Sequence, residues 1–293
     1  MSLERALEVL APGLRTYIQD VGRPGFAAIG VGRSGAADRG AFQLGARLLA
    51  QPYTAAALEV IFGGLSVRAH GDLQVALTGA PAPASVDGRG VGYCGPFALG
   101  DGETLTLDAP QVGLRTYVSV RGGIDVPPVL GSRSTDTLSG LGPPPLETGD
   151  ILPVGPAPAT FPDVDLAPTP PLSGEALILS ALCGPRDNWF ADIAALDGRM
   201  WTVSSDSDRV GIRLTGEPLQ RHDSRTEQEL PSEGVVRGSI QVPASGEPVV
   251  FLADHPVTGG YPVAAVLLDD DIDRIAQAVP GQQVRIVLVS GHP

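Results

Sequence analysis

The sequence contains no lysine, so its 20 basic residues are all arginines. The absence of lysine excludes Schiff-base catalysis by this chain and the Gly-Lys-Ser/Thr phosphate loop found in many nucleotide-binding proteins. Acidic residues number 33, which gives a net charge of −13 at pH 7. Because such a chain repels phosphate backbones and anionic lipid, we expect neither nucleic acid nor a membrane surface as a partner.

Cysteine is also scarce. The chain has only Cys94 and Cys183, too few for a disulfide framework or a four-cysteine zinc site. We expect both thiols to be reduced and mostly buried. Cys183 ends an apolar run before a Gly-Pro turn, and we interpret it as a buried strand-end residue rather than a nucleophile.

Histidine and long apolar runs are similarly rare. None of the four histidines lies at metal-ligand spacing from another, so no metal site is expected; they are His70, His222, His255 and His292. No apolar run reaches the roughly 18 residues that a membrane helix needs. The first twelve residues include Glu4 and Glu8 and do not have the pattern of a secretory signal. We therefore predict a cytoplasmic protein.

Glycine and proline are abundant, with 38 and 28 residues, and they separate many short β-branched runs. This pattern is typical of a mainly β barrel or sandwich with a few short helices. Two helices are expected. Asp38 is placed to cap the first, over 38–51. The second begins in the acidic run at 269 and turns Ile272, Ile275 and Ala276 inward.

A proline-rich stretch divides the sequence. Residues 153–171 include seven prolines in nineteen positions, which indicates an extended, semi-rigid connection. We predict an N-terminal half over 1–155, a connection over 156–172 and a C-terminal half over 173–293. The word GLRTY occurs at 13–17 and again at 113–117. We interpret both copies as strand entries that follow a glycine turn.

Two segments carry residues suited to ligand binding. Residues 19–40 contain six glycines, three arginines and two aspartates. Glycine lets backbone N–H groups approach a ligand, and arginine forks onto carboxylate or phosphate. Pairing of these arginines with the segment's own aspartates is an equally good interpretation. The string GVGRSG at 30–35 matches G-x-G-x-x-G in spacing, but no strong β-like run leads directly into it, which argues against a dinucleotide site.

The second segment, ADHPVTGGYP at 253–262, joins two apolar runs. Asp254 and His255 offer acid and base groups, and Tyr261 offers a phenol. Adjacent residues on a strand point to opposite sides, so a direct couple between Asp254 and His255 is not expected. Two prolines stiffen the loop. These features favour a site over a plain hairpin.

Long words in the sequence match a known family in the correct order. They include TYIQDVGRPGFAAIGVGRSGAAD at 16–38, YVSVRGGIDVPPVLGSRSTD at 117–136 and SEGVVRGSIQVPASGEPVVFLAD at 232–254, followed by TGGYP at 258–262. The chain resembles the biotin-dependent carboxyltransferase-like family, also called allophanate hydrolase subunit 2. Within it, the chain is most similar to the KipA-like proteins, which form the C subunit of 5-oxoprolinase. The resemblance implies two cyclophilin-like β-barrel halves.

The resemblance also implies partners and a reaction. Relatives act with a KipI-like protein, and a third component completes an ATP-dependent enzyme that opens 5-oxoproline to glutamate. An alternative is carboxyl transfer from biotin to a urea-like or amide acceptor. The chain lacks the Ala-Met-Lys-Met motif of a biotin carrier, so the carrier would act in trans. A further alternative is a non-catalytic regulatory partner of a KipI-like protein.

On the first of these interpretations, we expect a ligand site at the interface with the partner. General-base chemistry is assigned first to Asp254 and second to His255, with Tyr261 as a further catalytic candidate. The residues expected to bind substrate are Gln19, Asp20, Arg23, Arg33, Asp38, Arg209, Gln241, Thr258, Gly259 and Gly260. One departure bears on this prediction. Where the family has Gln-Thr-Thr before Gly-Gly-Tyr, this chain has His255-Pro256-Val257-Thr258, which puts substrate specificity in doubt.

Overall fold

The computed structural model describes residues 5–161, 163–226 and 228–289. The chain forms two compact units. Unit 1 comprises Met1–Arg23, Ser34–Asp136 and Gly140–Leu172, and unit 2 comprises Pro24–Arg33, Thr137–Ser139 and Ser173–Pro293. Two short segments of the N-terminal sequence therefore belong to the second unit. The halves predicted at 1–155 and 173–293 stay a prediction about domains.

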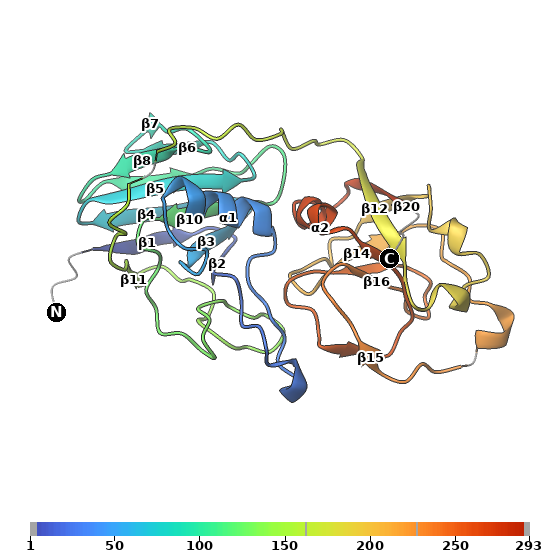
Figure 1. Ribbon diagram of the computed structural model, residues 1–293. Helices are drawn as coiled ribbons and strands as arrows, with labels where there is room; N and C mark the ends of the chain where they lie inside the picture. The colour runs from blue at the N-terminus through green and yellow to red at the C-terminus, as the bar shows by residue number, and fades with distance from the viewer. Residues whose placement is uncertain (1–4, 162, 227, 290–293) are drawn as a thin grey trace. The chain divides into compact units, whose positions relative to one another are not determined.

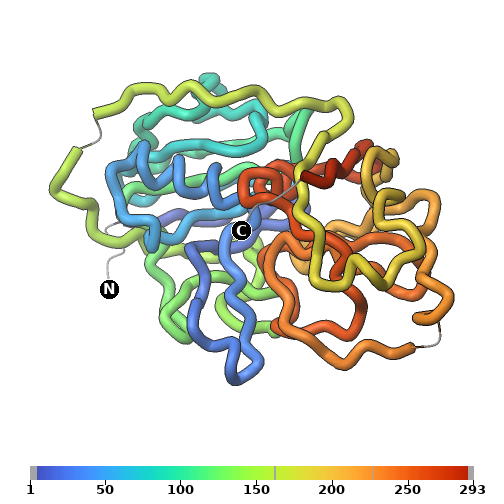
Figure 2. The backbone as a smooth tube through the Cα atoms, turned by 45° about the vertical axis from the view of Figure 1, so that its right-hand side comes forward, coloured from blue at the N-terminus to red at the C-terminus, as the bar shows by residue number. Residues whose placement is uncertain are grey.

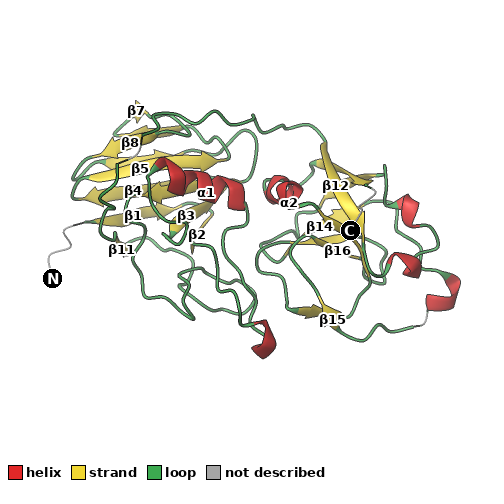
Figure 3. Cartoon of the chain, in the orientation of Figure 1, coloured by secondary structure: helices red, strands yellow, loops and turns green. Residues whose placement is uncertain are grey.

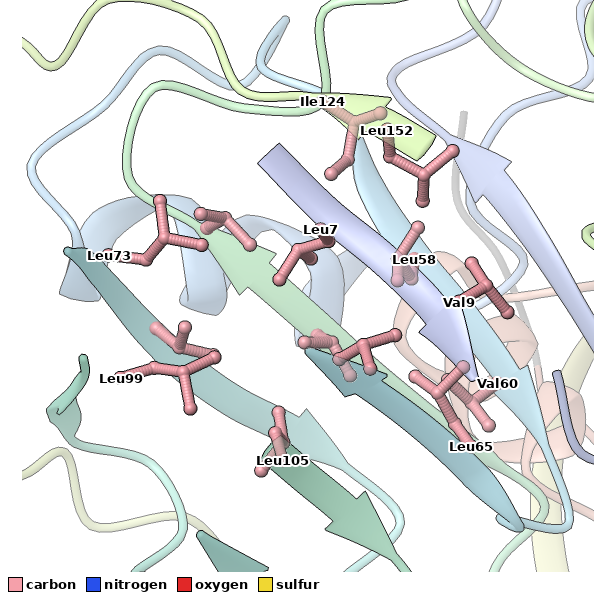
Figure 4. Packing of buried hydrophobic residues seen from close by; sticks show 14 of the residues in the cluster. Leu7, Val9, Leu58, Val60, Leu65, Leu73, Leu99, Leu105, Ile124 and Leu152 are labelled. Carbon is pink, nitrogen blue, oxygen red and sulfur yellow. The ribbon is translucent and has the colours of Figure 1, made fainter. Parts of the chain in front are cut away.

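Unit 1 contains two antiparallel sheets (Figures 1 and 3). The six-stranded sheet has the order β11-β1-β4-β9-β6-β7, with bounds Ile151–Pro153, Ala6–Pro12, Leu65–His70, Thr104–Leu107, Ala84–Val86 and Arg89–Gly90. The five-stranded sheet has the order β2-β3-β10-β5-β8, with bounds Arg15–Gln19, Ala57–Ile61, Arg115–Val120, Leu73–Gly79 and Pro96–Leu99. Alternating apolar side chains from both sheets form one core, in which Leu7, Leu58 and Leu105 are fully buried (Figure 4).

Helix α1, Arg39–Leu48, packs on the five-stranded sheet against β5 and β10. Asp38 caps it as predicted, because its side chain accepts a hydrogen bond from the N–H of Ala41. Gly45 permits the close approach, since a Cβ there would lie 2.3 Å from the Ser119 hydroxyl oxygen. The capped helix therefore fixes the end of the glycine-rich segment that precedes it.

The repeated word GLRTY enters two strands that flank the same neighbour. Gly13 and Gly113 both have positive φ, at 68° and 84°, and β2 and β10 follow them. Each strand pairs antiparallel with β3 in the same register, so that Tyr17 and Tyr117 both lie opposite Glu59. The interpretation as two strand entries after glycine turns is confirmed.

Unit 2 is a closed barrel with the order β12-β19-β16-β17-β14-β13-β20. Its strands are Leu177–Cys183, Val263–Leu267, Ser239–Gln241, Val249–Phe251, Gly211–Thr215, Met200–Val203 and Gln283–Leu288. A separate two-stranded ladder joins β15, Glu233–Gly234, to β18, Thr258–Gly259. The described residues include four short 3-10 helices, at Ala27–Ile29, Asp187–Trp189, Ile193–Ala195 and Asp223–Arg225. Helix α2, Asp269–Ala276, buries Ile272, Ile275 and Ala276 as predicted.

The prediction of a mainly β protein is confirmed, with two α-helices in the described part of the chain. Residues 156–172, where described, form neither helix nor strand and run as the extended yellow-green tube of Figure 2. Within the described ranges, no helix is long and apolar enough to cross a lipid bilayer. One expectation about burial is wrong. Cys94 is buried, but Cys183 is exposed, because β12 loses its alternation of buried and exposed residues at its end.

The partly buried Tyr93 and the fully buried Tyr117 are expected to make the stability of unit 1 depend on pH in the alkaline range. Burial raises the pKa of Tyr93 to about 12 from an ordinary 10.0. Burial, followed by the charges of Glu59 and Asp38, raises the pKa of Tyr117 well above its ordinary value. Because the folded state holds these protons more tightly than the unfolded state, their contribution to stability is complete below pH 10. It is lost as the pH rises from there toward the folded-state pKa values.

We therefore expect the free energy of unfolding to fall from about pH 10 to pH 12. Because the sequence has no lysine, no lysine ammonium group titrates in this pH window and contributes to the slope. Denaturant unfolding at several pH values measures the slope, and Tyr117→Phe is expected to flatten it. A wild-type slope of zero across this window would contradict the argument.

Candidate functional site

The carboxylate of Asp20 ties two distant segments of unit 1 together. Its Oδ1 accepts hydrogen bonds from the N–H of Gly22 at 2.8 Å and from the hydroxyls of Ser132 and Ser134 at 2.6 Å each. Its Oδ2 accepts from the N–H of Arg133 at 2.7 Å. The side chain is nearly fully buried. Since both oxygens are already engaged, the structure favours a positioning role for Asp20 over the predicted contact with substrate.

Next to Asp20 lies a set of buried polar atoms without hydrogen-bond partners. Arg23 donates from Nη2 to the Ser134 carbonyl, and its Nη1 lies 3.8 Å from Asp136 Oδ2. Gln19 donates from Nε2 to the Thr135 carbonyl at 2.9 Å. Arg23 Nε and Nη1, Gln19 Oε1 and Thr135 Oγ1 have no hydrogen-bond partner among the described residues. We call Gln19, Arg23 and Thr135 the Arg23 cluster.

The Arg23 cluster combines unused cationic donors with an unused amide acceptor and an unused hydroxyl. Buried polar groups without partners cost free energy, so a site of this kind is completed by a ligand or by ordered water. Arginine donors suit a carboxylate, and an amide oxygen suits an N–H group. Gly142 lies close to the cluster, since a Cβ there would lie 2.0 Å from the Ser134 carbonyl oxygen and 3.2 Å from Arg23 Nη2.

The glycine-rich segment that ends at Asp38 is anchored by buried groups of the sheet. Glu59 Oε2 accepts hydrogen bonds from the N–H of Ala37 at 3.0 Å and from the Tyr117 hydroxyl at 2.7 Å. The same hydroxyl accepts from the N–H of Asp38 at 2.9 Å. Asp38 itself receives the N–H of Ala41 at 2.8 Å as a helix cap. These contacts favour a structural role for Asp38, as the cap of α1, over the predicted contact with a ligand.

In unit 2, Asp254 forms a buried ion pair with Arg209. Asp254 Oδ2 accepts from Arg209 Nε at 2.9 Å, and Oδ1 accepts from Nη2 at 3.1 Å. Oδ2 also accepts from the N–H of Thr137 at 2.9 Å and from its hydroxyl at 2.8 Å. This Asp254 cluster, Thr137, Arg209 and Asp254, holds the segment 137–139 against the barrel. The contacts favour a positioning role for Asp254 over the predicted general-base role.

His255 occupies different surroundings from Asp254. Its ring stacks on Phe251 with centroids 6.0 Å apart. Its Nδ1 lies 2.7 Å from the Pro256 carbonyl, which can only accept, so we assign the proton to Nδ1. This assignment leaves Nε2 as the ring's acceptor nitrogen.

Gln241 lies against two residues of the predicted loop, Gly259 and Tyr261. Gln241 Nε2 donates to the Tyr261 carbonyl at 2.9 Å. A Cβ on Gly259 would lie 2.5 Å from the same nitrogen, so the glycine leaves room for the contact. Thr258 and Gly259 form β18, and the Tyr261 side chain is 48% exposed.

Gly259→Ala is expected to break the contact between Gln241 and Tyr261, because the new methyl group displaces the flexible amide. The cost is the loss of one hydrogen bond, about 1 kcal/mol of unfolding free energy. Gly260→Ala is the matched control, since the nearest atom to its Cβ is 3.6 Å away. Chemical denaturation measures both. Equal stabilities of the two variants would contradict this role of Gly259.

The structure distributes the predicted residues over both units. Gln19, Asp20, Arg23 and Asp38 lie in unit 1, whereas Arg33 lies in unit 2 with Arg209, Gln241 and the loop 254–261. The sequence analysis did not predict a role for Ser132, Ser134, Thr135 or Thr137. The word GSRSTD at 131–136, which matches the family, was the signal that could have found the first three. No group of three or more His, Cys, Asp or Glu residues forms a metal site within the described ranges, and His292 lies outside them.

Comparisons with known proteins agree on a family. The model of the carboxyltransferase domain, subdomain A and B, matches residues 29–288. The chain is 38% identical to the C subunit of 5-oxoprolinase from Escherichia coli, over 97% of this chain and 91% of that protein. It is 30% identical to the protein of the same name from Haemophilus influenzae, with the same coverage of 97% and 91%.

A solved structure gives the same assignment. The urea amidolyase of K. lactis matches with a TM-score of 0.91 and 30% identity over 97% of this chain. The chain spans only 19% of that much longer protein. With the fold, the ordered sequence words and these matches in agreement, the chain belongs to the family of the carboxyltransferase domain, subdomain A and B.

Proposed function

We propose that this chain is the KipA-like C subunit of an ATP-dependent 5-oxoprolinase, a complex that opens 5-oxoproline to glutamate. The proposal includes a KipI-like protein that shares the site, a third subunit, and the cytoplasm as the place of action. ATP is expected to bind in the complex and not necessarily on this chain. The similarity to two proteins that carry the name of this 5-oxoprolinase component, over nearly their full length, supports this choice.

The observation that carries the proposal is the set of unused polar atoms in the Arg23 cluster. 5-Oxoproline has a carboxylate and a ring amide with one N–H. Arg23 Nε and Nη1 are donors that match the carboxylate, and Gln19 Oε1 is an acceptor that matches the N–H. Thr135 Oγ1 remains for the ring carbonyl or an ordered water.

The four atoms are closed to solvent in the chain, so binding requires a local opening. The loop at Gly142 is the cover that we expect to move, since it contacts both Ser134 and Arg23. Ring opening breaks the amide C–N bond and adds one water, whose oxygen goes to the carbonyl carbon and whose proton goes to nitrogen. His255 and Tyr261 stay predictions for catalysis, and Asp254 is proposed as a positioning residue.

The test uses an E. coli strain that lacks its own KipA-like protein and expresses this chain. Consumption of added 5-oxoproline by the lysate, with and without ATP, is the readout. We expect ATP-dependent consumption that Arg23→Gln strongly slows at low concentrations of 5-oxoproline and that Arg68→Gln, at a half-exposed surface pair, preserves. If this chain co-purifies with the host subunits and consumption is still absent, the proposal is wrong.

A second candidate is carboxyl transfer from biotin to a urea-like or amide acceptor, favoured by the TM-score of 0.91 to the K. lactis urea amidolyase. This reaction needs a carboxylated biotin carrier supplied in trans. Incubating the complex with such a carrier and an amide acceptor tests it. Carboxylation of the acceptor that depends on this chain would favour this candidate over ring opening.

A further inference from the structure

A pocket lies in unit 1, and its lining includes no residue of the Arg23 cluster. It has a volume of about 350 Å³, which is at the lower end of the range of about 300–1,000 Å³ for small-molecule sites. Its lining includes three prolines, Pro52, Pro156 and Pro158, and two charged residues, Asp125 and Arg133. A pocket with this lining suits a small ligand that has both an apolar and a charged part.

Contacts within the protein fix the backbone around the pocket. Gly122, at φ 109°, and Gly155 approach so closely that a Cβ on Gly122 would lie 2.1 Å from the Gly155 carbonyl oxygen. Arg5 donates to the carbonyls of Gly155 and Arg121, each at 2.8 Å. Arg121 donates to the Pro158 carbonyl at 2.6 Å. The proline wall is therefore fixed in place before any ligand arrives.

Arg133 and Asp125 each have one polar side-chain atom that can bind a ligand. Arg133 Nη2 lies 2.6 Å from Asp125 Oδ1, and Arg133 Nε donates to the Val126 carbonyl at 2.7 Å. Arg133 Nη1 and Asp125 Oδ2 have no hydrogen bond or ion pair with any described residue. The side chains are 29% and 51% exposed, so solvent and solutes reach them. The pocket thus offers a free cationic donor beside a free anionic acceptor.

We propose that this pocket binds a small zwitterion of the α-amino-acid class. The ligand's carboxylate contacts Arg133 Nη1, its ammonium contacts Asp125 Oδ2, and its side chain lies against the prolines. A simple anion satisfies only the arginine and faces the negative charge of Asp125. 5-Oxoproline is such an anion, because its nitrogen is an uncharged amide, whereas glutamate carries both an ammonium and an α-carboxylate. The pocket therefore distinguishes the product of the proposed reaction from its substrate.

The position of Arg133 links this pocket to the Arg23 cluster. Its side chain lines the pocket, while its own N–H donates to Asp20 Oδ2. The residues on either side, Ser132 and Ser134, donate to Asp20 Oδ1. Arg133 is therefore common to the pocket and to the segment that positions Asp20 beside the predicted substrate site. This link to the substrate rests on the proposed function, whereas binding of the zwitterion does not.

Calorimetric titration of the purified full chain tests the binding without relying on enzyme activity. The probes are L-proline and L-glutamate as amino acids, with propionate and 5-oxoproline as anions and n-butylammonium as a cation. We expect at least one amino acid to bind about tenfold or more tightly than every singly charged probe. Asp125→Asn and Arg133→Gln are each expected to weaken that binding at least tenfold.

Two further variants serve as controls, one distant from the pocket and one that blocks it. Arg89→Gln removes the arginine of an exposed ion pair elsewhere in unit 1 and is expected to leave binding unchanged. Thr54→Trp places a large side chain at an exposed lining position, and it is expected to abolish binding while the chain stays folded. Absence of amino-acid binding would overturn the proposal. So would anion binding as tight as amino-acid binding, or binding that survives Thr54→Trp.

Discussion

Replacing Arg23 with glutamine is expected to lower kcat/KM for 5-oxoproline by about 10²- to 10⁴-fold in the assembled complex. Two hydrogen bonds to a charged partner contribute about 1.5–3 kcal/mol each, and a tenfold change corresponds to about 1.4 kcal/mol. Arg23 offers two such atoms, Nε and Nη1, that no described residue uses as hydrogen-bond donors. The loss is expected mainly as a raised KM, since the carboxylate is bound equally in the ground state and in the transition state.

Separate variants distinguish ligand binding from structural damage. Gln19→Leu removes only the unused amide acceptor and its bond to Thr135, and we expect a loss of about tenfold in kcat/KM. Arg23→Lys keeps a charge but not the two-pronged geometry, so it is expected to recover only part of the activity. Steady-state kinetics, with thermal unfolding of each variant, provides the readouts. A folded, assembled Arg23→Gln complex with an unchanged KM would contradict the assignment of the carboxylate to Arg23.

Asp254→Asn is expected to cost about 3–5 kcal/mol of unfolding free energy, as does the removal of one partner from other buried ion pairs. Arg209 is buried to 3% exposure, and its charge would then lose a bidentate partner. Arg209→Gln is expected to cost a similar amount, because it leaves the Asp254 charge without its bidentate ion pair. Chemical denaturation of both single variants and the double variant gives the coupling free energy of the pair.

The same variants decide the role of Asp254. If Asp254 positions the segment 137–139 and Arg209, both single variants are expected to lose activity in parallel with their stability. If Asp254 is the general base, Asp254→Asn loses turnover far beyond Arg209→Gln. A folded, assembled Asp254→Asn complex without turnover, beside an active Arg209→Gln complex, would therefore return the general-base role to Asp254.

Local patterns in the sequence were sufficient to predict much of the fold. The β-branched runs became strands, the cap at Asp38 starts α1, and the acidic run at 269 starts α2. The two-residue strands β7, β15 and β18 were not predictable, because pairing with distant partners defines them rather than their own residues. The exposure of Cys183 was missed, because the end of β12 departs from the alternation of the strand.

The sites depend on contacts between residues far apart in the sequence. Asp20 and Ser132 are 112 positions apart, and Thr137 and Asp254 are 117 positions apart. Composition and spacing therefore indicated the polar residues but not their partners. Without these partners, Asp20 and Asp254 look like reactive carboxylates, and the structure shows both as acceptors of several hydrogen bonds. Only the structure shows that atoms of Gln19 and Arg23 are buried without hydrogen-bond partners among the described residues.

The most direct test of the central claim is glutamate release from 5-oxoproline by a complex rebuilt from this chain, its KipI-like partner and the third subunit. Release is measured with and without ATP, and with this chain omitted and then added back. We expect release that needs both ATP and this chain. A stable complex that releases no glutamate would contradict the proposed 5-oxoprolinase function and favour carboxyl transfer or regulation. His255-Pro256-Val257 would then be the first segment to restore to the family's sequence.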